Sequence, residues 1–279
     1  MHHTTLRILF LIACSYGTLL SQQTEKPSTP TEKSSSPADT VNFPSIRSRI
    51  RDQDFFISLD PKNIQSYSKR ANLKMSLGDF SGALSDYSKW AELEPKNYYP
   101  LYLCAVCSER QDNLNTALGF FSKAINLAPE NEGCIIDRGL IENKLKQYTA
   151  AQADFRKALA LKPNWTVALF GLGLTYDDQN EYTSALDYYG KSIRADSTNY
   201  KSYNNIGVIF NKLEKYEAAI QHFSKAILMN PNYAKAYSNR AEAKYKSGNK
   251  NEACEDMRKS VELGSTEGLK VITEYCKDH

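Results

Sequence analysis

A repeat of 34 residues constrains the fold of this chain more than any other feature of its sequence. Four series of residues recur at this interval, without insertion or deletion. The first is Pro61, Pro95, Pro129, Pro163 and Pro231, with Ser197 and Ser265 at the two remaining places. The others are Ala71, Ala105, Gly139, Gly173, Gly207 and Ala241; Ala83, Ala117, Ala151, Ala185, Ala219 and Ala253; and Tyr87, Phe121, Phe155, Tyr189, Phe223 and Met257. Such a register predicts a stack of similar units, because one unit cannot bury its apolar face alone.

Within each repeat, apolar residues recur at helical spacing in two stretches, which predicts two amphipathic helices. In the fifth repeat Gly207 and Ala219 are small enough for the two helices to approach closely, and Phe223 can fill the gap towards the next repeat. The turn between the helices needs a residue that tolerates a positive φ. Residues suited to it stand there in four repeats, namely Gly78, Asp112, Asn180 and Gly248, whereas Lys146 and Glu214 are poorly suited.

These series resemble the tetratricopeptide repeat (TPR) family at positions 8, 20, 24 and 32 of its unit, and the resemblance covers Ile64 to Ser265. It implies an all-α fold, a right-handed α-solenoid of six tetratricopeptide helix pairs within residues 62–265. The six repeats are 64–97, 98–131, 132–165, 166–199, 200–233 and 234–265.

Both ends of such a stack need a cover. Residues 46–61 are expected to form an N-terminal capping helix with Phe55, Phe56 and Leu59 against the first repeat. Residues 266–279 are expected to form a C-terminal capping helix. Its inner face would carry Leu269, Ile272, Tyr275 and Cys276.

The first 21 residues are predicted to be an export signal, with Arg7 before an apolar run that is too short to span a bilayer. Two ways of processing stay open. The residues that end at Cys14 resemble a lipobox, which would make Cys14 the lipidated N-terminus, or cleavage follows Gly17 or Ser21. Residues 22–45 are rich in Ser, Thr and Pro and are expected to form a disordered tether. A cytosolic protein with an apolar N-terminus is the alternative.

Composition argues against several classes of function. A net charge of +3 is too mild a basic excess to favour nucleic-acid binding. The chain has four histidines, and three of them lie at its ends. The remaining one, His222, is expected at the solvated outer side of a second helix. With no phosphate loop, nucleophile elbow, catalytic carboxylate cluster or zinc spacing in the sequence, we expect neither an enzyme nor a cofactor or metal site.

The cysteines are interpreted mainly as packing residues. Cys104 and Cys107 have redox-motif spacing, but they fall in the middle of a first helix, whereas redox pairs use a helix N-terminus. Cys134 falls where it could approach Cys104, and Cys254 could meet Cys276 if the closing helix folds back. Asn164-Trp165-Thr166 is a glycosylation acceptor pattern that only a eukaryotic secretory pathway would use.

In this family the first helices line a concave groove that holds a peptide, so the resemblance implies which side chains line it here. They are Tyr99, Tyr102, Leu103 and Val106 in repeat 2, Ile136 and Leu140 in repeat 3, Phe170 and Leu174 in repeat 4, Asn204 and Asn205 in repeat 5, and Lys235 and Asn239 in repeat 6. The middle of this set is apolar and the C-terminal third is polar and basic. It therefore predicts a partner with apolar anchors at one end and acidic character at the other. In the alternative, tight curvature buries some of these side chains against one another.

Taken together, the sequence predicts a scaffold that binds a protein or peptide partner and is exported to the cell envelope. The location would be the periplasm or the outer membrane in a bacterium, or the secretory pathway in a eukaryote. The alternative is an intracellular co-chaperone or assembly factor. The carboxylate clamp of chaperone-binding members is matched at only two of five places, because Phe170 and Asn239 stand at charged places and Leu174 stands at an asparagine place in the best alignment.

Overall fold

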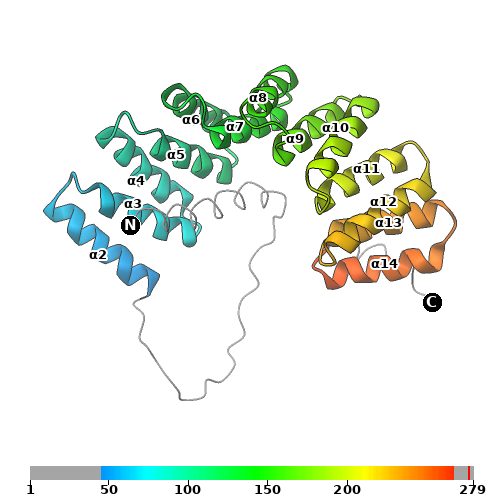
Figure 1. The fold of residues 1–279 in the computed structure, drawn as a ribbon. Helices are drawn as coiled ribbons and strands as arrows, with labels where there is room; N and C mark the ends of the chain where they lie inside the picture. The colour runs from blue at the N-terminus through cyan, green and yellow to red at the C-terminus, as the bar shows by residue number, and fades with distance from the viewer. Residues whose placement is uncertain (1–44, 267–275, 277–279) are drawn as a thin grey trace, which may run out of the picture. The chain divides into compact units, whose positions relative to one another are not determined.

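The computed structural model describes residues 45–266 and Cys276, and residues 1–44, 267–275 and 277–279 lie outside this description. Over the described residues the chain forms thirteen α-helices and no strand (Figure 1). Their bounds are α2 Ile46–Leu59, α3 Ile64–Ser76, α4 Phe80–Leu93, α5 Tyr98–Arg110, α6 Leu114–Leu127, α7 Glu132–Lys144, α8 Tyr148–Leu161, α9 Thr166–Asp178, α10 Tyr182–Ala195, α11 Tyr200–Lys212, α12 Tyr216–Met229, α13 Ala234–Lys246 and α14 Lys250–Glu262.

The helices follow one another as pairs, and consecutive helices pack side by side from α2 to α6 and from α8 to α14. Helices α3 to α14 form six such pairs, each within one 34-residue repeat. The all-α solenoid expected from the sequence is therefore confirmed. The chain divides into two compact bodies, Met1–Asp137 and Arg138–His279, and each is described by itself below.

The turn between the two helices of every pair contains one residue with a positive φ, whether or not that residue type favours a positive φ. The backbone takes a positive φ at Gly78, Asp112, Asn180 and Gly248, as expected, and also at Lys146 and Glu214, both with φ of 59°. At Lys146 the backbone amide donates to the Asn143 carbonyl at 2.9 Å, and the next amide donates to the Glu142 carbonyl at 2.8 Å. The helix packing thus imposes a left-handed residue that costs about 1 kcal/mol for a side chain other than glycine.

Large rings are held against glycines in the core of the second body. A Cβ at Gly173 would lie 2.5 Å from the Tyr189 ring. The ring of Phe155 lies between Gly139 of its own repeat and Gly171 of the next, and a Cβ at these two glycines would approach it to 3.0 and 2.6 Å. Since Tyr189 and Phe155 are both fully buried, the small and large series form one interlocked core.

Helix α2 does not bury the side chains that were expected to cover the first repeat. Phe55, Phe56 and Leu59 are 59, 46 and 68% exposed, and α2 contains no buried residue. Ile50 and Ile57 are half-buried, and the helix packs against α3. The expectation for the three apolar side chains is therefore wrong, because a helix at the end of a stack has a neighbour on one side and these residues lie on the other.

The expected C-terminal capping helix lies outside the described residues, apart from Cys276. None of the helices described is long and apolar enough to cross a membrane. The export signal and the tether also lie outside the described part of the chain.

Candidate functional site

In the first body, the predicted groove residues form the edge of an aromatic cluster. Tyr99 stacks on Tyr102 with ring centroids 6.2 Å apart, and Trp90 meets the Tyr99 ring edge-on at 5.9 Å. Tyr102 is 8% exposed, and its hydroxyl donates to Asp137 Oδ2 at 2.9 Å. Tyr99 therefore remains half-buried beside a ring that is already covered.

Two predicted contact residues of this body are too deeply buried to meet a partner directly. Ile136 is 3% exposed, and Tyr102 is 8% exposed. The expectation that they line an open groove is corrected, since they pack inside the repeats. Leu103 and Val106 stay half-buried, so they remain accessible in part.

In the second body, apolar groove residues lie half-buried on successive first helices. Leu140 is on α7, and Phe170 and Leu174 are on α9. Phe170 and Leu174 rest on a buried cluster that includes Tyr189, with the Phe170 and Tyr189 ring centroids 5.6 Å apart. These three side chains therefore offer apolar surface on a rigid support.

The predicted amides of repeats 5 and 6 bond mainly to one another. Asn239 Nδ2 donates to Asn204 Oδ1 at 2.9 Å, and Asn204 Nδ2 donates to Asn205 Oδ1 at 3.1 Å. Asn205 Nδ2 in turn donates to the Tyr189 hydroxyl at 3.1 Å. Asn204 is fully buried. Its expected role in holding a peptide backbone is therefore wrong, whereas Asn205 and Asn239 stay half-buried and Lys235 is exposed.

Polar side chains 35 residues apart join neighbouring first helices at their C-terminal ends. Asn143 Nδ2 donates to Asp178 Oδ2 at 2.7 Å, and Lys212 Nζ lies 3.0 Å from Asp177 Oδ1. Burial raises the pKa of Asp177, and the Lys212 ammonium opposes this rise. These links were not predicted from the sequence, although polar residues at a spacing of 35 are a signal for them.

A second set of ion pairs, 16 residues apart, fixes the two helices within a repeat. Arginine and aspartate pair in repeats 1, 3 and 6, with Nε to Oδ2 distances of 2.9, 2.7 and 2.8 Å. The pairs are Arg70 with Asp86, Arg138 with Asp154, and Arg240 with Asp256. The sequence analysis did not single out this spacing. All three aspartates are buried, so the pairs stabilise the scaffold rather than face a partner.

Next to these ion pairs, one position of the first helix carries a different charge in repeat 3 than in repeats 1 and 6. Lys74 and Lys244 add a second cation to the aspartate in repeats 1 and 6. In repeat 3 the same place holds Glu142, which is 7% exposed and whose Oε2 has no hydrogen-bond partner. Burial first and Asp154 second raise the pKa of Glu142 to about 7, against the opposing effect of Arg138.

The cysteines behave as packing residues at three places and as a disulfide at a fourth. Cys104, Cys107 and Cys134, hereafter the three buried thiols, are fully buried. Burial raises the pKa of Cys104 to about 11 and that of Cys107 to about 12, which disfavours a redox thiolate. The suggested approach of Cys104 and Cys134 has produced no disulfide. Cys254 and Cys276 do form one, as expected, with Cα atoms 5.8 Å apart.

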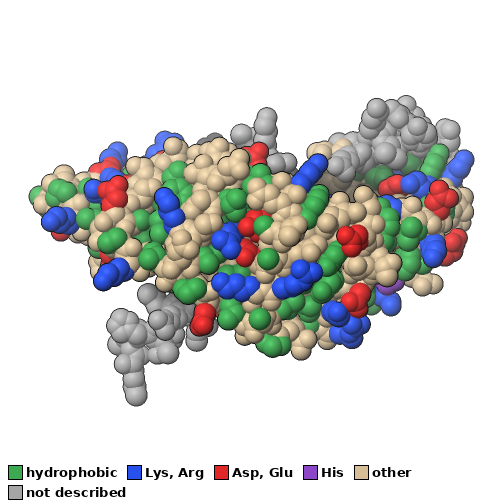
Figure 2. Space-filling view, turned by 90° about the horizontal axis from the view of Figure 1, so that it is seen from above, with side chains coloured by type: hydrophobic (Ala, Val, Ile, Leu, Met, Phe, Trp, Pro, Cys, Tyr) green, Lys and Arg blue, Asp and Glu red, His purple; other side chains and the backbone are tan. Residues whose placement is uncertain are grey.

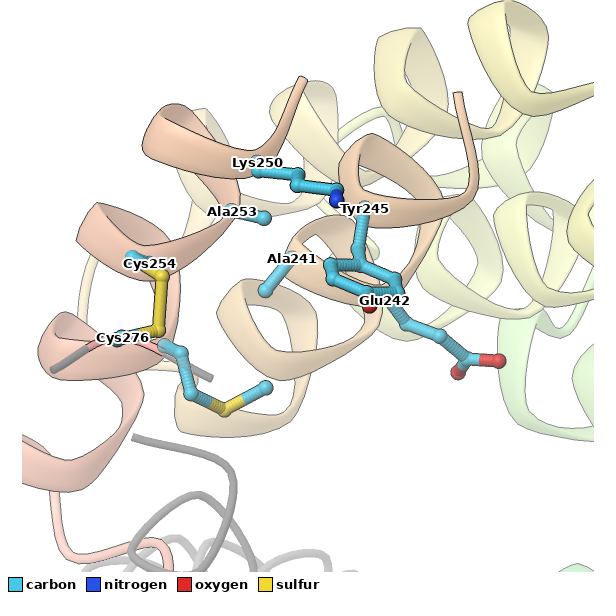
Figure 3. Close-up of a pocket in the computed structure, with 8 residues that line it drawn as sticks. Ala241, Glu242, Tyr245, Lys250, Ala253, Cys254 and Cys276 are labelled. Carbon is cyan, nitrogen blue, oxygen red and sulfur yellow. A yellow bond between two sulfur atoms is a disulfide. The ribbon is translucent and has the colours of Figure 1, made fainter. Parts of the chain in front are cut away.

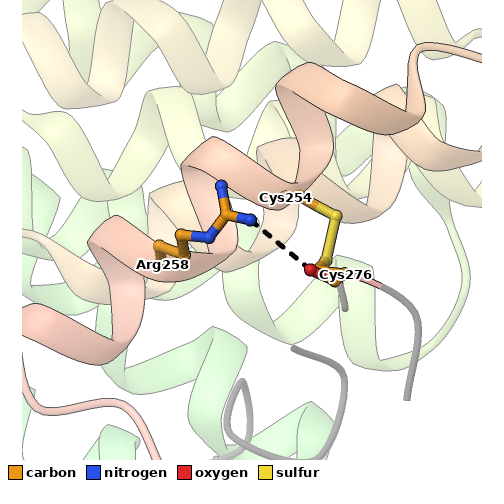
Figure 4. Close-up of a disulfide and its surroundings, with 3 residues drawn as sticks. All are labelled: Cys254, Arg258 and Cys276. Atoms are coloured by element: carbon orange, nitrogen blue, oxygen red, sulfur yellow. Dashed lines mark hydrogen bonds between the residues drawn. A yellow bond between two sulfur atoms is a disulfide. The ribbon is translucent and has the colours of Figure 1, made fainter. Parts of the chain in front are cut away.

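The disulfide borders a shallow apolar cavity of about 300 Å³ at the C-terminal end of the second body. Figure 3 shows Ala241, Tyr245 and Ala253 around it, with the disulfide at one side. Arg258 Nη2 donates to the Cys276 carbonyl at 3.5 Å across the same bridge (Figure 4). Helix α14 therefore holds Cys276 by a covalent bond and a weak hydrogen bond.

His222 is not the solvated residue that was expected. Its ring lies against Phe210 with centroids 5.3 Å apart, and its Nδ1 is buried without a hydrogen-bond partner. Burial, with Lys225 as the second cause, lowers its pKa. The reason is the neighbouring first helix α11, whose Phe210 covers the imidazole.

Charges of both signs lie on the face of the protein that Figure 2 shows. The described residues contain no group of three or more His, Cys, Asp and Glu side chains that could hold a metal ion. On the coloured part of the face in Figure 2, Lys and Arg side chains are interspersed with Asp and Glu. What the helices present is therefore half-buried apolar surface with scattered charges, on a repeating helical support.

This arrangement defines a helical repeat protein whose surface is suited to contact with other polypeptides. Residues 137–200, 200–233 and 234–263 each match a model described as a tetratricopeptide repeat, and the chain belongs to this family. The earlier helix pairs, within residues 64–131, keep the same register.

Solved structures share the fold at low identity. A tetratricopeptide repeat protein from Parabacteroides merdae is 20% identical with a TM-score of 0.69, over 83% of this chain and 91% of that one. MamA from Desulfovibrio magneticus RS-1 is 22% identical with a TM-score of 0.55, over 61% of this chain and 96% of that one. No curated protein matches the sequence. These likenesses support the architecture alone.

Proposed function

We propose that this protein is an adaptor that binds a partner polypeptide on the first helices of its repeats. Proteins of this family generally mediate protein–protein interactions. The observation that carries the proposal is the half-buried apolar row of Leu140, Phe170 and Leu174, on first helices that buried ion pairs and ring contacts hold in place. Rigid apolar anchors of this kind contribute most of the affinity at protein interfaces.

The charge beside this row favours an acidic segment in the partner. Lys235 is exposed on α13. Asn239 is half-buried on the same helix, and Asn205 is half-buried on α11, the first helix of the preceding repeat. An acidic segment would gain from Lys235 mainly in association rate and specificity. The binding residues proposed in the second body are therefore Leu140, Phe170, Leu174, Asn239 and Lys235.

The test is capture of partners by the purified protein from an envelope extract of its source cells. Phe170→Ser should weaken capture at least tenfold, because it removes the central anchor, and Lys235→Glu should weaken capture of an acidic partner. The matched controls are Leu228→Ser, at an apolar residue 71% exposed on second helix α12, and Lys215→Glu at the start of the same helix. If the controls weaken capture as much as the first-helix variants, the proposal fails.

Folding must be monitored in the same experiment, because Phe170 contacts buried Tyr189. Lys235→Glu separates an effect on binding from an effect on folding, because an exposed side chain can be changed with little effect on stability. Loss of capture by this variant at an unchanged melting temperature supports direct binding. Capture that Lys235→Glu and Phe170→Ser both leave unchanged contradicts it.

We further propose that the protein is exported to the cell envelope. The apolar residues 8–13 and the Ser, Thr and Pro-rich residues 22–45 support this, and so does the disulfide between Cys254 and Cys276, because disulfides persist in oxidising compartments. Metabolic labelling with an alkyne fatty acid tests whether Cys14 is lipidated, with Cys14→Ser as the control. Recovery of the protein in the cytosol, with Cys254 and Cys276 trapped as thiols, would favour the intracellular alternative.

A further inference from the structure

Helix α2 exposes a row of side chains in which one place, that of Phe55, differs in kind from the second helices of the six repeats. Arg47, Arg51, Phe55 and Leu59 follow at intervals of four and therefore lie in one row along the helix. Phe55 and Leu59 are 59 and 68% exposed. In all six repeats the place of Phe55, counted in steps of 34, holds a lysine. These lysines are Lys89, Lys123, Lys157, Lys191, Lys225 and Lys259.

The register places α2 as a second helix, but the face that receives a first helix in the repeats has changed. Its bounds, Ile46–Leu59, lie 34 residues before those of α4, Phe80–Leu93. Arg49 stands where the six repeats have alanine, and Gln53 stands where they have a large apolar side chain. A first helix could not pack there as it does in the repeats, so the occupant of α2 must use the outer row.

The charges of α2 are segregated along its length. Arg47, Arg49 and Arg51 lie in its N-terminal half, and Asp52 and Asp54 follow them, with Asp60 just after the last turn. This order opposes the helix dipole, which favours acidic residues at the N-terminus and basic residues at the C-terminus. Within one chain Asp54 is paired with Arg70 of α3 at 2.7 Å. An antiparallel neighbour of the same charge order would bring acidic residues towards the arginines of the N-terminal half.

We propose that α2 docks antiparallel on α2 of a second copy of this chain. A two-fold axis near Gln53 places Arg51 of each copy against Phe55 of the other and Arg47 against Leu59, with Asp60 next to Arg47. Each guanidinium then lies on an aromatic ring, and the arginine stems cover the leucine. The interface is isologous, since the same row serves both copies.

Other occupants fit this surface less well. Three arginines and three aspartates over residues 46–60 leave no net charge, which gives an anionic lipid surface little to attract. The tether, residues 22–45, has few apolar side chains to cover Phe55 and Leu59. The second copy supplies both the apolar row and the complementary charge.

The dimer is expected to be weak. Helix α2 has 14 residues and is therefore about 21 Å long. One helix pair of this length buries less than the roughly 1,200–2,000 Å² of a standard stable interface. A dissociation constant on the order of 10–100 µM is expected, which places self-association in a range that sedimentation can follow.

The experiment is sedimentation velocity of the purified protein from about 1 µM to several hundred µM. The wild type should pass from monomer to dimer over this range. Phe55→Lys, which installs the residue of the six repeats, should weaken dimerisation at least tenfold. Leu228→Lys, at an exposed leucine of α12, is the matched control and should have no effect. A wild type that stays monomeric, or a Phe55→Lys variant that dimerises normally, overturns the proposal.

A mixing experiment tests the antiparallel geometry. The double variant Arg47→Glu, Arg51→Glu should not dimerise alone, and neither should Phe55→Lys, Leu59→Lys. An equimolar mixture should form a heterodimer, because the introduced carboxylates of one chain then face the introduced ammonium groups of the other. Unchanged helicity by circular dichroism verifies folding. A mixture that remains monomeric overturns the antiparallel pairing, and so does wild type that binds vesicles of anionic phospholipid as a monomer.

Discussion

Replacing Glu142 with glutamine should stabilise the second body at pH 8 and leave its stability unchanged at pH 4. Glu142 lies beside Asp154 and Arg138, where repeats 1 and 6 carry a lysine in its place. One arginine therefore serves two carboxylates in repeat 3. The Oε2 atom of Glu142 is buried without a hydrogen-bond partner, so its ionised form is poorly compensated.

The magnitude follows from the pKa of this carboxyl. Burial raises the pKa of Glu142 from 4.5 to about 7, and the difference corresponds to about 3 kcal/mol when the group is ionised in the folded state. The stability gained from proton binding is fully present below about pH 4.5 and is lost as the pH rises to about 7. Glutamine keeps the shape without the charge, so Glu142→Gln should gain roughly 1–3 kcal/mol above pH 7.

The assay is thermal unfolding followed by circular dichroism at 222 nm, from pH 4 to pH 8. A gain of this size should raise the melting temperature by roughly 3–9 °C at pH 8, at about 3 °C per kcal/mol. Glu142→Lys, which recreates the charges of Lys74 and Lys244, should do the same. Glu255→Gln, at an exposed carboxylate of α14, is the control. A Glu142→Gln effect that is equal at pH 4 and pH 8 would refute the reasoning.

Three further outcomes are expected. Gly173→Ala should destabilise the second body by about 1–3 kcal/mol in urea unfolding, because the added Cβ would clash with the Tyr189 ring. The control is Gly190→Ala, where the nearest atom to the added Cβ is Nη1 of Arg194 at 3.5 Å. This variant should be slightly more stable than the wild type, since alanine favours a helix over glycine. Loss of the disulfide by Cys254→Ser and Cys276→Ser, which are 22 residues apart, should cost about 3 kcal/mol, and dithiothreitol should lower the melting temperature of the wild type alone. Iodoacetamide at pH 8 should label the three buried thiols in urea and leave them unlabelled in the folded protein, as mass spectrometry would show; fast labelling of the folded chain would contradict their burial.

Much of the fold could be predicted because the 34-residue register encodes both helices of a repeat. The small and large series meet in the core as expected, with Tyr189 against Gly173 as one example. The link from Cys254 to Cys276 was suggested by a closing helix that folds back, and not by the register, because Cys276 lies beyond the repeats. The positive φ at Lys146 did not follow from local preference, since the packing of two helices outweighs the conformational cost of one residue.

The candidate site was less predictable, because the register does not give the sideways offset between repeats. This offset brings Asn204 against Asn239 and buries it. The contact of Phe210 with His222, between the two helices of repeat 5, was not foreseen either. The end of the stack was also misjudged. Periodicity locates α2, but it does not say that Phe55 of this helix is 59% exposed.

The position of the Phe155 ring between Gly139 and Gly171 limits which repeats can be deleted or duplicated. Repeats of constant length look interchangeable, so that one could be lost or duplicated without a change of frame. The Phe155 ring, however, needs a glycine at the sixth place of the following repeat. Deletion of repeat 4 would bring Asn205 to that place. The packing of Phe155 therefore constrains the order of repeats 3 and 4, and loss of repeat 4 would need a compensating substitution at the new junction.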